Sequence, residues 1–409
     1  MLLRFQSRHG FKREYIIAFA LLLNTFSWYF VSQLMVTRIG NVFDNACFEN
    51  LCLELAYPIS IIASAFVGSV LLARARKIPF FYVWLLLGVF ASLCLAIPVG
   101  SSLSAWLILI SILGASLGLG MPLCLSYFTE LVPIENRGKV GGIILFATTF
   151  TAPLGLIAMD VMDLMLSAVF LALLRAWSLP LLFLTSEKNV PSEMNVKKSP
   201  SISSVLYNRT FSLYFVAWLM FALVDSFGGV IVDLNIGEFQ FFIGIVEPII
   251  TGFSALIGGV ISDWVGRKRV LIFGFVSLGM AYATIGFLWE TLPVSWFFYF
   301  IIDGIALGLL WVILTIVLWG EVGRYATEKY YAVGEAPFFL TQILYLLLAP
   351  YIALIPEYGV FSLAAFFLFI AVIPLLYARE TLPEKKIQQR QLKIYTKEAL
   401  KLKQKIEQK

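Results

Sequence analysis

Residues 258–269 read Gly-Gly-Val-Ile-Ser-Asp-Trp-Val-Gly-Arg-Lys-Arg, and a long apolar run lies on each side of this stretch. A helix needs about 20 mostly apolar residues to cross the hydrocarbon core of a bilayer, and both runs are long enough. The stretch is therefore expected to be a very short hydrophilic turn between two membrane-spanning helices. Its basic cluster also indicates on which side of the membrane the turn lies.

The composition favours a membrane protein along the whole chain. Of 409 residues, 60% are hydrophobic and only 13% are charged. A soluble domain of this size does not need so much apolar surface, so the surrounding solvent is expected to be a bilayer. The apolar runs are long and continuous, which favours helices over the short alternating strands of a membrane barrel. The first run has no small-residue cleavage site and is expected to be a retained helix.

Hydropathy predicts twelve spans, and an even number places both termini on one side of the membrane. The spans are expected at about 15–36, 51–73, 79–98, 104–129, 139–159, 163–184, 211–233, 239–262, 270–289, 293–319, 331–355 and 358–378. All but two of the 30 lysines and arginines fall on the side of the termini, the exceptions being Arg38 and Arg175. Because basic residues accumulate in cytoplasmic loops, both termini are predicted to be cytoplasmic, in a multi-pass protein of the cell membrane.

The second half of the chain repeats features of the first half. The matches, 190 or 191 residues apart, are Gly68, Arg76 and Lys77 with Gly259, Arg267 and Lys268, Glu130 with Glu321, and Gly114-x-x-x-Gly118 with Gly304-x-x-x-Gly308. Small-residue faces of the last kind let two helix backbones approach closely. A constant offset across three features predicts two six-helix halves. The expected division is a bundle over 1–184, a cytoplasmic linker over 185–210, a second bundle over 211–378 and a charged cytoplasmic tail over 379–409.

The short turn also carries a family resemblance. Its Gly259, Asp263, Gly266, Arg267 and Lys268 stand in the order G-x-x-x-D-x-x-G-R-K. This order resembles the signature loop of the major facilitator superfamily, which lies between the second and third helices of each half. Residues 130–138 are similar to the E-x-x-P-x-x-x-R-G segment of the sugar-porter branch, and residues 379–384 are loosely similar to its P-E-T ending. The resemblance implies the major facilitator fold, an all-α membrane protein of two pseudo-symmetric six-helix bundles.

The first half matches the family pattern less completely. Its acidic position is Leu72 and its second glycine position is Ala75, so only Gly68, Arg76 and Lys77 match. Leu72 is expected to leave the two basic residues without their acidic partner. The central P-E-S-P-R motif and the glutamine motif of the seventh span are absent as well, which weakens the case for a sugar as substrate.

The resemblance assigns a gate to the cytoplasmic ends of the helices. In the family, salt bridges and helix-dipole contacts there hold the outward-facing state and part when the inner side opens. An exposed ion pair contributes only about 0–1 kcal/mol, which suits a lock that opens in every cycle. The alternative is that these residues are ordinary membrane anchors. The predicted gate residues are Gly68, Arg76, Lys77, Glu130, Arg137, Gly259, Asp263, Gly266, Arg267, Lys268 and Glu321.

Polar residues inside the spans are candidates for a transport pathway, because hydrocarbon penalises an unpaired charge. The predicted pathway residues are Asn24, Trp28, Gln33, Asp225, Glu247 and Asp303. Asp225 and Asp303 rank highest, since the seventh and tenth helices line the central cavity in this family. Desolvation disfavours an ionised carboxylate, so either aspartate would be able to hold a proton. The alternative is a structural pair with Arg175, which is itself expected to be paired or to snorkel rather than to bind an anion.

These features predict a secondary active transporter that moves a small polar metabolite, such as a sugar or an organic acid, by alternating access. Proton coupling through carboxylates is expected, because the only histidine, His9, lies outside the spans. A drug or metabolite efflux carrier is one alternative, and a sensor or scaffold that kept the fold is another. The sequence has no nucleotide-binding loop, catalytic cluster or metal cluster, so an enzyme, a cofactor, a metal and a nucleic-acid partner are not expected. The expected partners are the solute, protons and the lipid bilayer, with the protein acting as a monomer.

Overall fold

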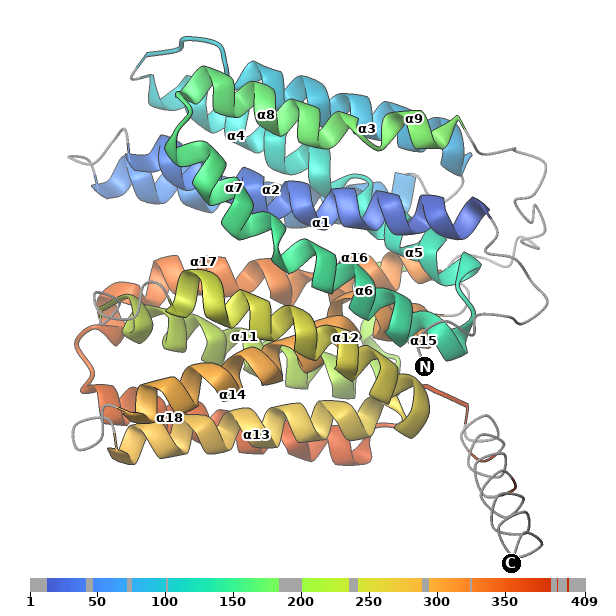
Figure 1. The fold of residues 1–409 in the computed structure, drawn as a ribbon, viewed down its shortest axis with the longest axis vertical. Coiled ribbons are helices and arrows are strands. Elements are labelled where there is room, and N and C mark those ends of the chain that lie inside the picture. Colours follow the sequence, from blue (N-terminus) through green and yellow to red (C-terminus); the bar gives the residue numbers. More distant parts are fainter. Residues whose placement is uncertain are drawn as a thin grey trace, which may run out of the picture.

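The computed structural model describes residues 13–41, 47–71, 76–100, 102–183, 201–234, 242–288, 294–323 and 326–383, together with residues 388 and 396. Its helices run side by side (Figure 1), and twelve helical segments in these ranges are long and apolar enough to cross a membrane. Each overlaps its predicted range, so the prediction of twelve spans is confirmed. Most of the predicted linker and most of the predicted tail lie outside the described residues.

The spans are built from single helices or from helices in series. The first half contains α1 (Arg13–Gly40), α2 (Cys47–Leu71), α3 (Lys77–Cys94), α4 (Leu103–Gly118), α5 (Met121–Leu131), α6 (Arg137–Thr149), α7 (Thr151–Asp160), α8 (Leu164–Ala176) and α9 (Leu179–Leu182). The second half contains α10 (Ile202–Leu206), α11 (Arg209–Leu234), α12 (Glu247–Val265), α13 (Arg267–Leu288), α14 (Val294–Trp311), α15 (Leu318–Val322), α16 (Thr327–Gly334), α17 (Ala336–Ile352) and α18 (Glu357–Tyr377). A π-helical segment, Val312–Val317, joins α14 to α15, and another, Phe242–Val246, precedes α12. Such turns are frequent near functional sites.

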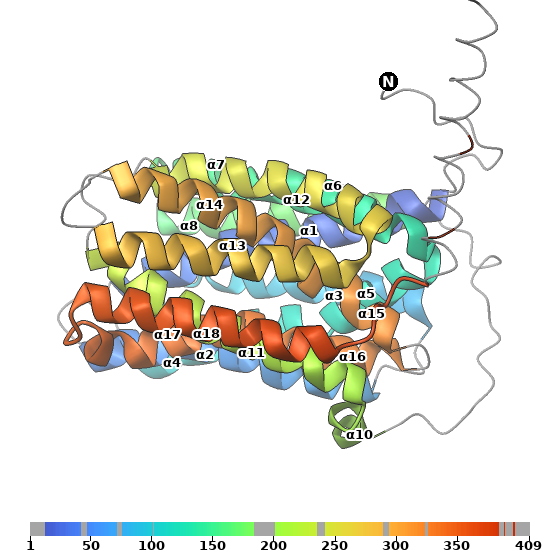
Figure 2. The same ribbon diagram turned by 90° about the horizontal axis from the view of Figure 1, so that it is seen from below.

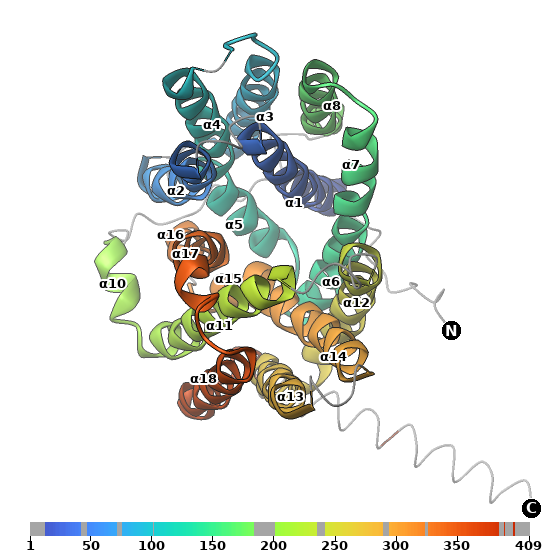
Figure 3. The same ribbon diagram turned by 90° about the vertical axis from the view of Figure 1, so that its left-hand side faces the viewer.

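The helices form two groups, as the sequence repeat predicts. Viewed along the helix axes, α1 to α8 form one group and α11 to α18 form the other (Figure 3). The groups adjoin where α6 lies beside α12 and where α17 lies beside α2. The short helix α10 lies at the margin, beside α16 and the start of α11 (Figure 2). The predicted fold class, twelve spans in two six-helix bundles, is therefore confirmed.

The repeated small-residue faces explain one helix contact in each bundle. In α4, a Cβ on Gly118 would lie 2.2 Å from the Ile61 carbonyl oxygen of α2. In α14, a Cβ on Gly308 would lie 2.3 Å from the Thr251 carbonyl oxygen of α12. Only glycine allows backbones to approach so closely, because any side chain would meet main-chain atoms that cannot move aside. The same device therefore holds α4 to α2 and α14 to α12.

Outward-facing side chains of the bundles are apolar, as a bilayer requires. Phe90 of α3 is 61% exposed and Phe287 of α13 is 82% exposed. In water such residues would form large apolar patches, but in hydrocarbon they are in their preferred solvent. The polar groups of the spans are consequently expected between the helices, where the site lies.

Two ends of the molecule are named here by one residue each. The Arg267 end holds the first turn of α1, Lys77 at the start of α3 and Arg267 at the start of α13 (Figure 1). The opposite Glu54 end holds the last turn of α1 and the first turns of α2, which include Glu54.

Candidate functional site

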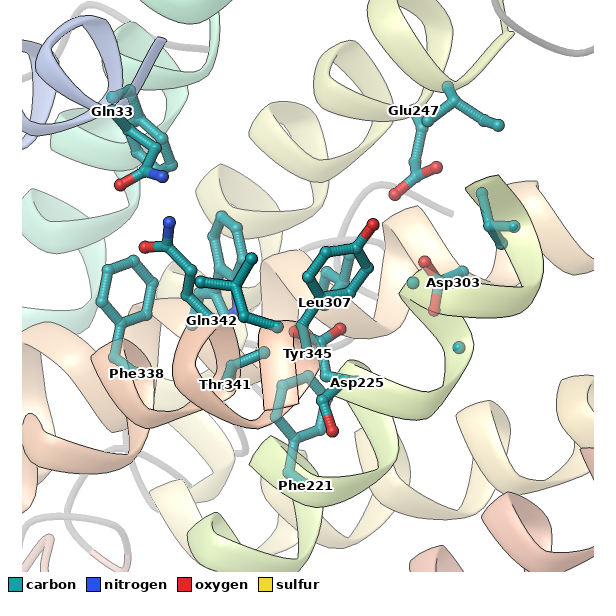
Figure 4. Close-up of a pocket in the computed structure, with 18 of the residues that line it drawn as sticks. Gln33, Phe221, Asp225, Glu247, Asp303, Leu307, Phe338, Thr341, Gln342 and Tyr345 are labelled. Atoms are coloured by element: carbon teal, nitrogen blue, oxygen red, sulfur yellow. The ribbon is translucent and has the colours of Figure 1, made fainter. Parts of the chain in front are cut away.

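A cavity of about 590 Å³ lies between the two bundles (Figure 4). Gln33 of α1 and Gln342 of α17 face each other across one part of it. Its lining also includes Thr37, Glu54 and Val232, which are close to the ends of their helices at the Glu54 end. The cavity therefore extends from the middle of the molecule toward the Glu54 end.

Three carboxyl groups from three different helices line the cavity: Asp225 of α11, Glu247 of α12 and Asp303 of α14 (Figure 4). Their side chains lie on the same side of the cavity. Carboxyl groups held together in a low-dielectric space repel one another when ionised, and a proton on one of them relieves that repulsion. Among the described residues, none of the three forms an ion pair. The cluster is therefore acidic, and its three carboxyl groups are the candidate proton-binding groups of the cavity.

Helix packing brings Glu247 and Asp303 together. Asp303 directly precedes Gly304, the first glycine of the small-residue face on α14. A Cβ on Gly304 would lie 3.2 Å from the Glu247 carbonyl oxygen. The close crossing of α12 and α14 thus sets the spacing of their two carboxyl groups.

Tyrosine hydroxyls lie next to this cluster. The Tyr299 hydroxyl donates to the Tyr282 hydroxyl at 3.1 Å, and both residues line the cavity. A Cβ on Gly228 of α11 would lie 2.1 Å from the Tyr282 oxygen, so glycine at this position admits the hydroxyl to the cavity wall. These phenols add hydrogen-bonding groups that are neutral at physiological pH.

An aromatic wall lines the cavity beside Gln33. The ring of Phe30 lies 6.2 Å from that of Trp311, and the ring of Tyr29 lies 5.4 Å from that of Phe338. Trp311 and Phe338 are themselves 5.7 Å apart. Because α1 belongs to the first bundle and α14 and α17 to the second, the wall crosses the boundary between the bundles.

Two predicted pathway residues, Asn24 and Trp28, lie elsewhere. Asn24 Nδ2 donates to the Leu174 carbonyl oxygen at 2.8 Å, and Trp28 Nε1 donates to Ser92 at 3.2 Å, inside the first bundle. Both side chains are fully buried on the face of α1 opposite the cavity. The prediction of their position was wrong, because α1 is buried almost all round and its sequence does not reveal which face meets the other bundle. Gln33 does line the cavity, and Tyr29, Phe30 and Thr37 line it as well, although they were not predicted.

Arg175 has no carboxylate partner among the described residues. Its guanidinium lies between two indole rings, 4.8 Å from the centre of Trp28 and 4.3 Å from that of Trp84, and its Nη1 donates to Asn24 Oδ1 at 2.9 Å. Cation–π contacts and one amide therefore stabilise this buried charge. The alternative in which Arg175 pairs with Asp225 or Asp303 was wrong.

The signature residues connect the two bundles at the Arg267 end. Arg267 pairs with Asp263 at 2.6 Å and with Glu321 at 3.0 Å, and its Nη2 donates to the Ile134 carbonyl oxygen of the first bundle at 2.8 Å. In return, Asp263 accepts the backbone N–H groups of Gly138 at 3.0 Å and of Lys139, where α6 begins. A carboxylate at a helix N-terminus is stabilised by the unpaired N–H groups and by the helix dipole.

Arg267, Asp263 and Glu321, named here the Arg267 cluster, are buried, whereas the gate ion pairs were expected to be exposed. The side chains of Arg267 and Glu321 are 0% exposed and that of Asp263 is 3% exposed. The expectation of weak, solvent-exposed pairs was therefore wrong for these three residues. A buried charge that loses its partner is far more costly than an exposed one, so breaking this cluster would cost more than predicted.

Glycines allow the bundles to meet beside this cluster. A Cβ on Gly138 of α6 would lie 2.4 Å from the Gly259 carbonyl oxygen, and one on Gly259 would lie 2.1 Å from the Gly138 carbonyl oxygen. Gly68 has a comparable position within the first bundle, where a Cβ would lie 2.1 Å from the Leu119 carbonyl oxygen. Gly138 and Gly259 therefore mark the contact between the bundles, and Gly68 marks a contact within the first bundle.

The first bundle has a salt bridge of its own at the Arg267 end. Lys77 pairs with Glu130, which corrects the expectation that Leu72 leaves Lys77 without an acid. Leu72 and Ala75 lie outside the described residues, and Arg76 is exposed at the start of α3 without a side-chain cap. Arg137 bonds to the carbonyl oxygens of Thr129 and Val132 at the end of α5, where a cation is favoured.

The loosely similar P-E-T segment also belongs to the Arg267 end. Glu380 accepts the N–H groups of Arg267 at 2.9 Å and Lys268 at 3.1 Å, and so caps α13. Gly266, which directly precedes α13, has φ +107°, so the turn favours glycine. A Cβ at this position would lie 2.4 Å from Glu380 Oε2, so the cap by Glu380 also requires glycine. Lys268 Nζ donates to the Leu376 carbonyl oxygen at 2.6 Å. Sequence reasoning missed Glu380, although its motif gave the signal.

The fold and the cavity together define a class: an all-α, multi-pass membrane protein with two six-helix bundles around a central cavity.

No family model and no curated protein matches the sequence. Solved structures do match it. One is the MFS proton:xylose symporter XylE, at 16% identity and a TM-score of 0.66 over 90% of this chain and 96% of that chain. Another is FucP in the outward conformation, at 14% identity and a TM-score of 0.67, with 90% of this chain and 99% of that chain covered. A third is the human organic anion transporter MFSD10, at 15% identity and a TM-score of 0.63, with 89% of this chain and 99% of that chain covered. The chain therefore has the major facilitator fold.

Proposed function

We propose that this protein is a secondary active transporter that moves a small polar solute by alternating access. The observation that carries the proposal is the asymmetry of the cavity between the bundles. It extends toward the Glu54 end, while Asp263, Arg267 and the N-terminus of α6 join the bundles at the Arg267 end. A transporter that opens to one side at a time requires this combination of a central site and a closed end.

The orientation in the proposal follows the basic residues. Both termini and the Arg267 end face the cytoplasm, because basic residues accumulate there. The arrangement described here is then outward-facing, with its gate on the cytoplasmic side. In this proposal the gate consists of Lys77, Glu130, Arg137 and the Arg267 cluster. The protein acts as a monomer in the cell membrane.

Proton coupling in the proposal runs through the carboxyl cluster. In this proposal one proton resides on Asp225, Glu247 or Asp303, which lie on the same side of the cavity and exchange it. The solved XylE structure is that of a proton:xylose symporter, which is a precedent on the same fold for a proton moving with a polar metabolite. Gln33, Gln342 and Tyr345 supply further hydrogen-bonding groups for a polar solute.

Uptake into liposomes tests the proposal. Purified protein is reconstituted and offered a panel of sugars, organic acids, amines and amphipathic drugs, with and without a pH gradient. The expected result is gradient-driven accumulation of at least one solute. Asp225→Asn and Asp303→Asn are expected to abolish that accumulation while exchange of the solute continues. Indifference to every solute and gradient would contradict transport and favour the scaffold alternative. Accumulation of drugs inside inverted vesicles would identify an efflux carrier.

A further inference from the structure

We infer that the cavity selects a solute with positive charge and apolar groups, an organic cation, over a sugar or an organic acid of similar size. The inference names the substrate class of the proposed transporter and therefore rests on the same cavity. Four features of the lining carry it: charge, position of the nearby arginines, aromatic surface, and volume.

The charged side chains that line the cavity are all acidic. They are Glu54, Asp225, Glu247 and Asp303, and no lysine, arginine or histidine is among the described lining residues. When ionised, these carboxyl groups give the cavity a negative potential, and a bound cation favours that ionised form. Walls of low dielectric constant strengthen that potential and raise the local concentration of cations.

The two arginines outside the predicted cytoplasmic side do not neutralise this charge. Arg38 donates to the Met159 and Met162 carbonyl oxygens, each at 2.7 Å, and so faces α7. Arg175 is enclosed by Trp28 and Trp84 within the first bundle. An organic acid would therefore lose its hydration in the cavity without meeting a cationic partner among the described residues, which is unfavourable.

Aromatic side chains give the cavity a surface that suits the apolar groups of a cation. Phe30, Trp311 and Phe338 form the wall beside Gln33. Trp218 and Phe221, on the same helix as Asp225, form a stacked pair with ring centres 5.3 Å apart. Ring faces attract ammonium groups as well as apolar groups. A sugar would use the hydroxyl and amide groups but would leave most of this wall without a partner.

The arrangement of these parts suggests the pose of the solute. In Figure 4, Asp225, Glu247 and Asp303 lie on one side of the cavity, and Gln33, Gln342 and Phe338 lie on the other. A volume of about 590 Å³ is in the range that holds a drug-sized ligand. The cationic head would lie at the carboxyl groups and the apolar part along the aromatic wall.

Binding calorimetry on the full chain in lipid nanodiscs tests the inference. Three probes are compared. Benzyltrimethylammonium is a permanent cation, phenylmethanesulfonate is a permanent anion of similar size, and xylose is a neutral sugar. We expect the cation to bind about tenfold or more tightly than either of the others. Asp225→Asn and Asp303→Asn should each weaken binding of the cation by about 10- to 100-fold, since each removes a charge next to the desolvated head. Glu49→Gln on α2, a carboxyl that does not line the cavity, is the control and should leave affinity unchanged.

Equal or tighter binding of the sulfonate or of xylose by the wild-type protein would overturn the inference, whatever the stability of the variants. Unchanged cation affinity in both folded aspartate variants would also overturn it. Failure of the proposed function gives a different result. In that case the cation binds with the expected selectivity, but no solute accumulates in liposomes under any gradient.

Discussion

At the scale of single residues, burial separates two kinds of ion pair at the Arg267 end. Asp263 and Arg267 are enclosed and form bonds to the other bundle, whereas the Glu130 side chain of the Lys77 pair is 37% exposed. Loss of one partner from a buried, hydrogen-bonded pair removes about 1–3 kcal/mol or more. An exposed pair contributes about 0–1 kcal/mol. Under the proposed mechanism, the buried cluster is therefore the part of the gate whose loss should have the larger effect.

Asp263→Asn should shift the protein toward a state that opens at the Arg267 end. The change removes the charge that balances Arg267 and weakens the bonds to the N-terminus of α6, at a cost of about 1–3 kcal/mol to the closed arrangement. A cysteine introduced at Ser126, which is 1% exposed, should react faster with an impermeant maleimide in this variant. Glu130→Gln is the matched control and should change the labelling rate much less. Equal labelling in both variants would show that burial of the cluster is unimportant.

Sequence reasoning found residues when their type was informative. Asp225, Glu247 and Asp303 stood out because a carboxyl group in an apolar span needs an explanation, and all three line the cavity. Asn24 and Trp28 were placed on the wrong face because polarity alone does not distinguish a cavity from a buried contact. Tyr29, Phe30 and Phe338 could not be found at all, since aromatic residues in a span face lipid, core or cavity with equal ease.

At the scale of elements, two helix crossings position the site. The Gly304-x-x-x-Gly308 face holds α14 on α12 and sets Asp303 beside Glu247. The sequence predicted this face from its spacing and its repeat in α4, because small residues four apart lie on one side of a helix. It could not predict which helix the face meets, since that depends on contacts between segments far apart in the chain.

Gly308→Ala should lower thermal stability and weaken binding of the cation. The new Cβ would meet the Thr251 carbonyl oxygen and the Ala255 nitrogen, at 2.3 and 2.6 Å, so the helices must separate, at a cost of about 1–3 kcal/mol. Gly244→Ala is the control, since a Cβ there would have nothing within 4 Å. Thermal unfolding followed by scanning fluorimetry and the calorimetric titration measure the two effects. A Gly308→Ala protein that matches the control in both would contradict the role of this crossing.

At the scale of the whole molecule, the sequence predicted the architecture well. Long apolar runs predicted the spans. With twelve spans, nearly all basic residues fall on one side of the membrane, which supported that number. The repeats at 190 and 191 residues predicted two halves. The repeat corresponds in part to structure. The equivalent acids Glu130 and Glu321 each pair with a basic residue, Lys77 and Arg267, although Lys77 is the equivalent of Lys268. The state of the molecule was not predictable. The bundles are joined at the Arg267 end by bonds such as that from Arg267 to the Ile134 carbonyl oxygen, which no local pattern encodes.

Alternating access requires the two bundles to move as units, so that one end opens while the other closes. Pairs of spin labels on the two bundles can follow both ends in a variant without native cysteines. One pair, at Arg76 and Arg269, reports on the Arg267 end, and the other, at Phe48 and Tyr358, reports on the Glu54 end.

The most direct test of the central claim is to measure both label distances by pulsed electron paramagnetic resonance in nanodiscs, before and after adding benzyltrimethylammonium and in the Asp263→Asn background. We expect the distances to change in opposite directions, with the Arg76–Arg269 distance increasing as the Phe48–Tyr358 distance decreases. Distances that stay fixed under every condition, or that increase and decrease together, would contradict the account.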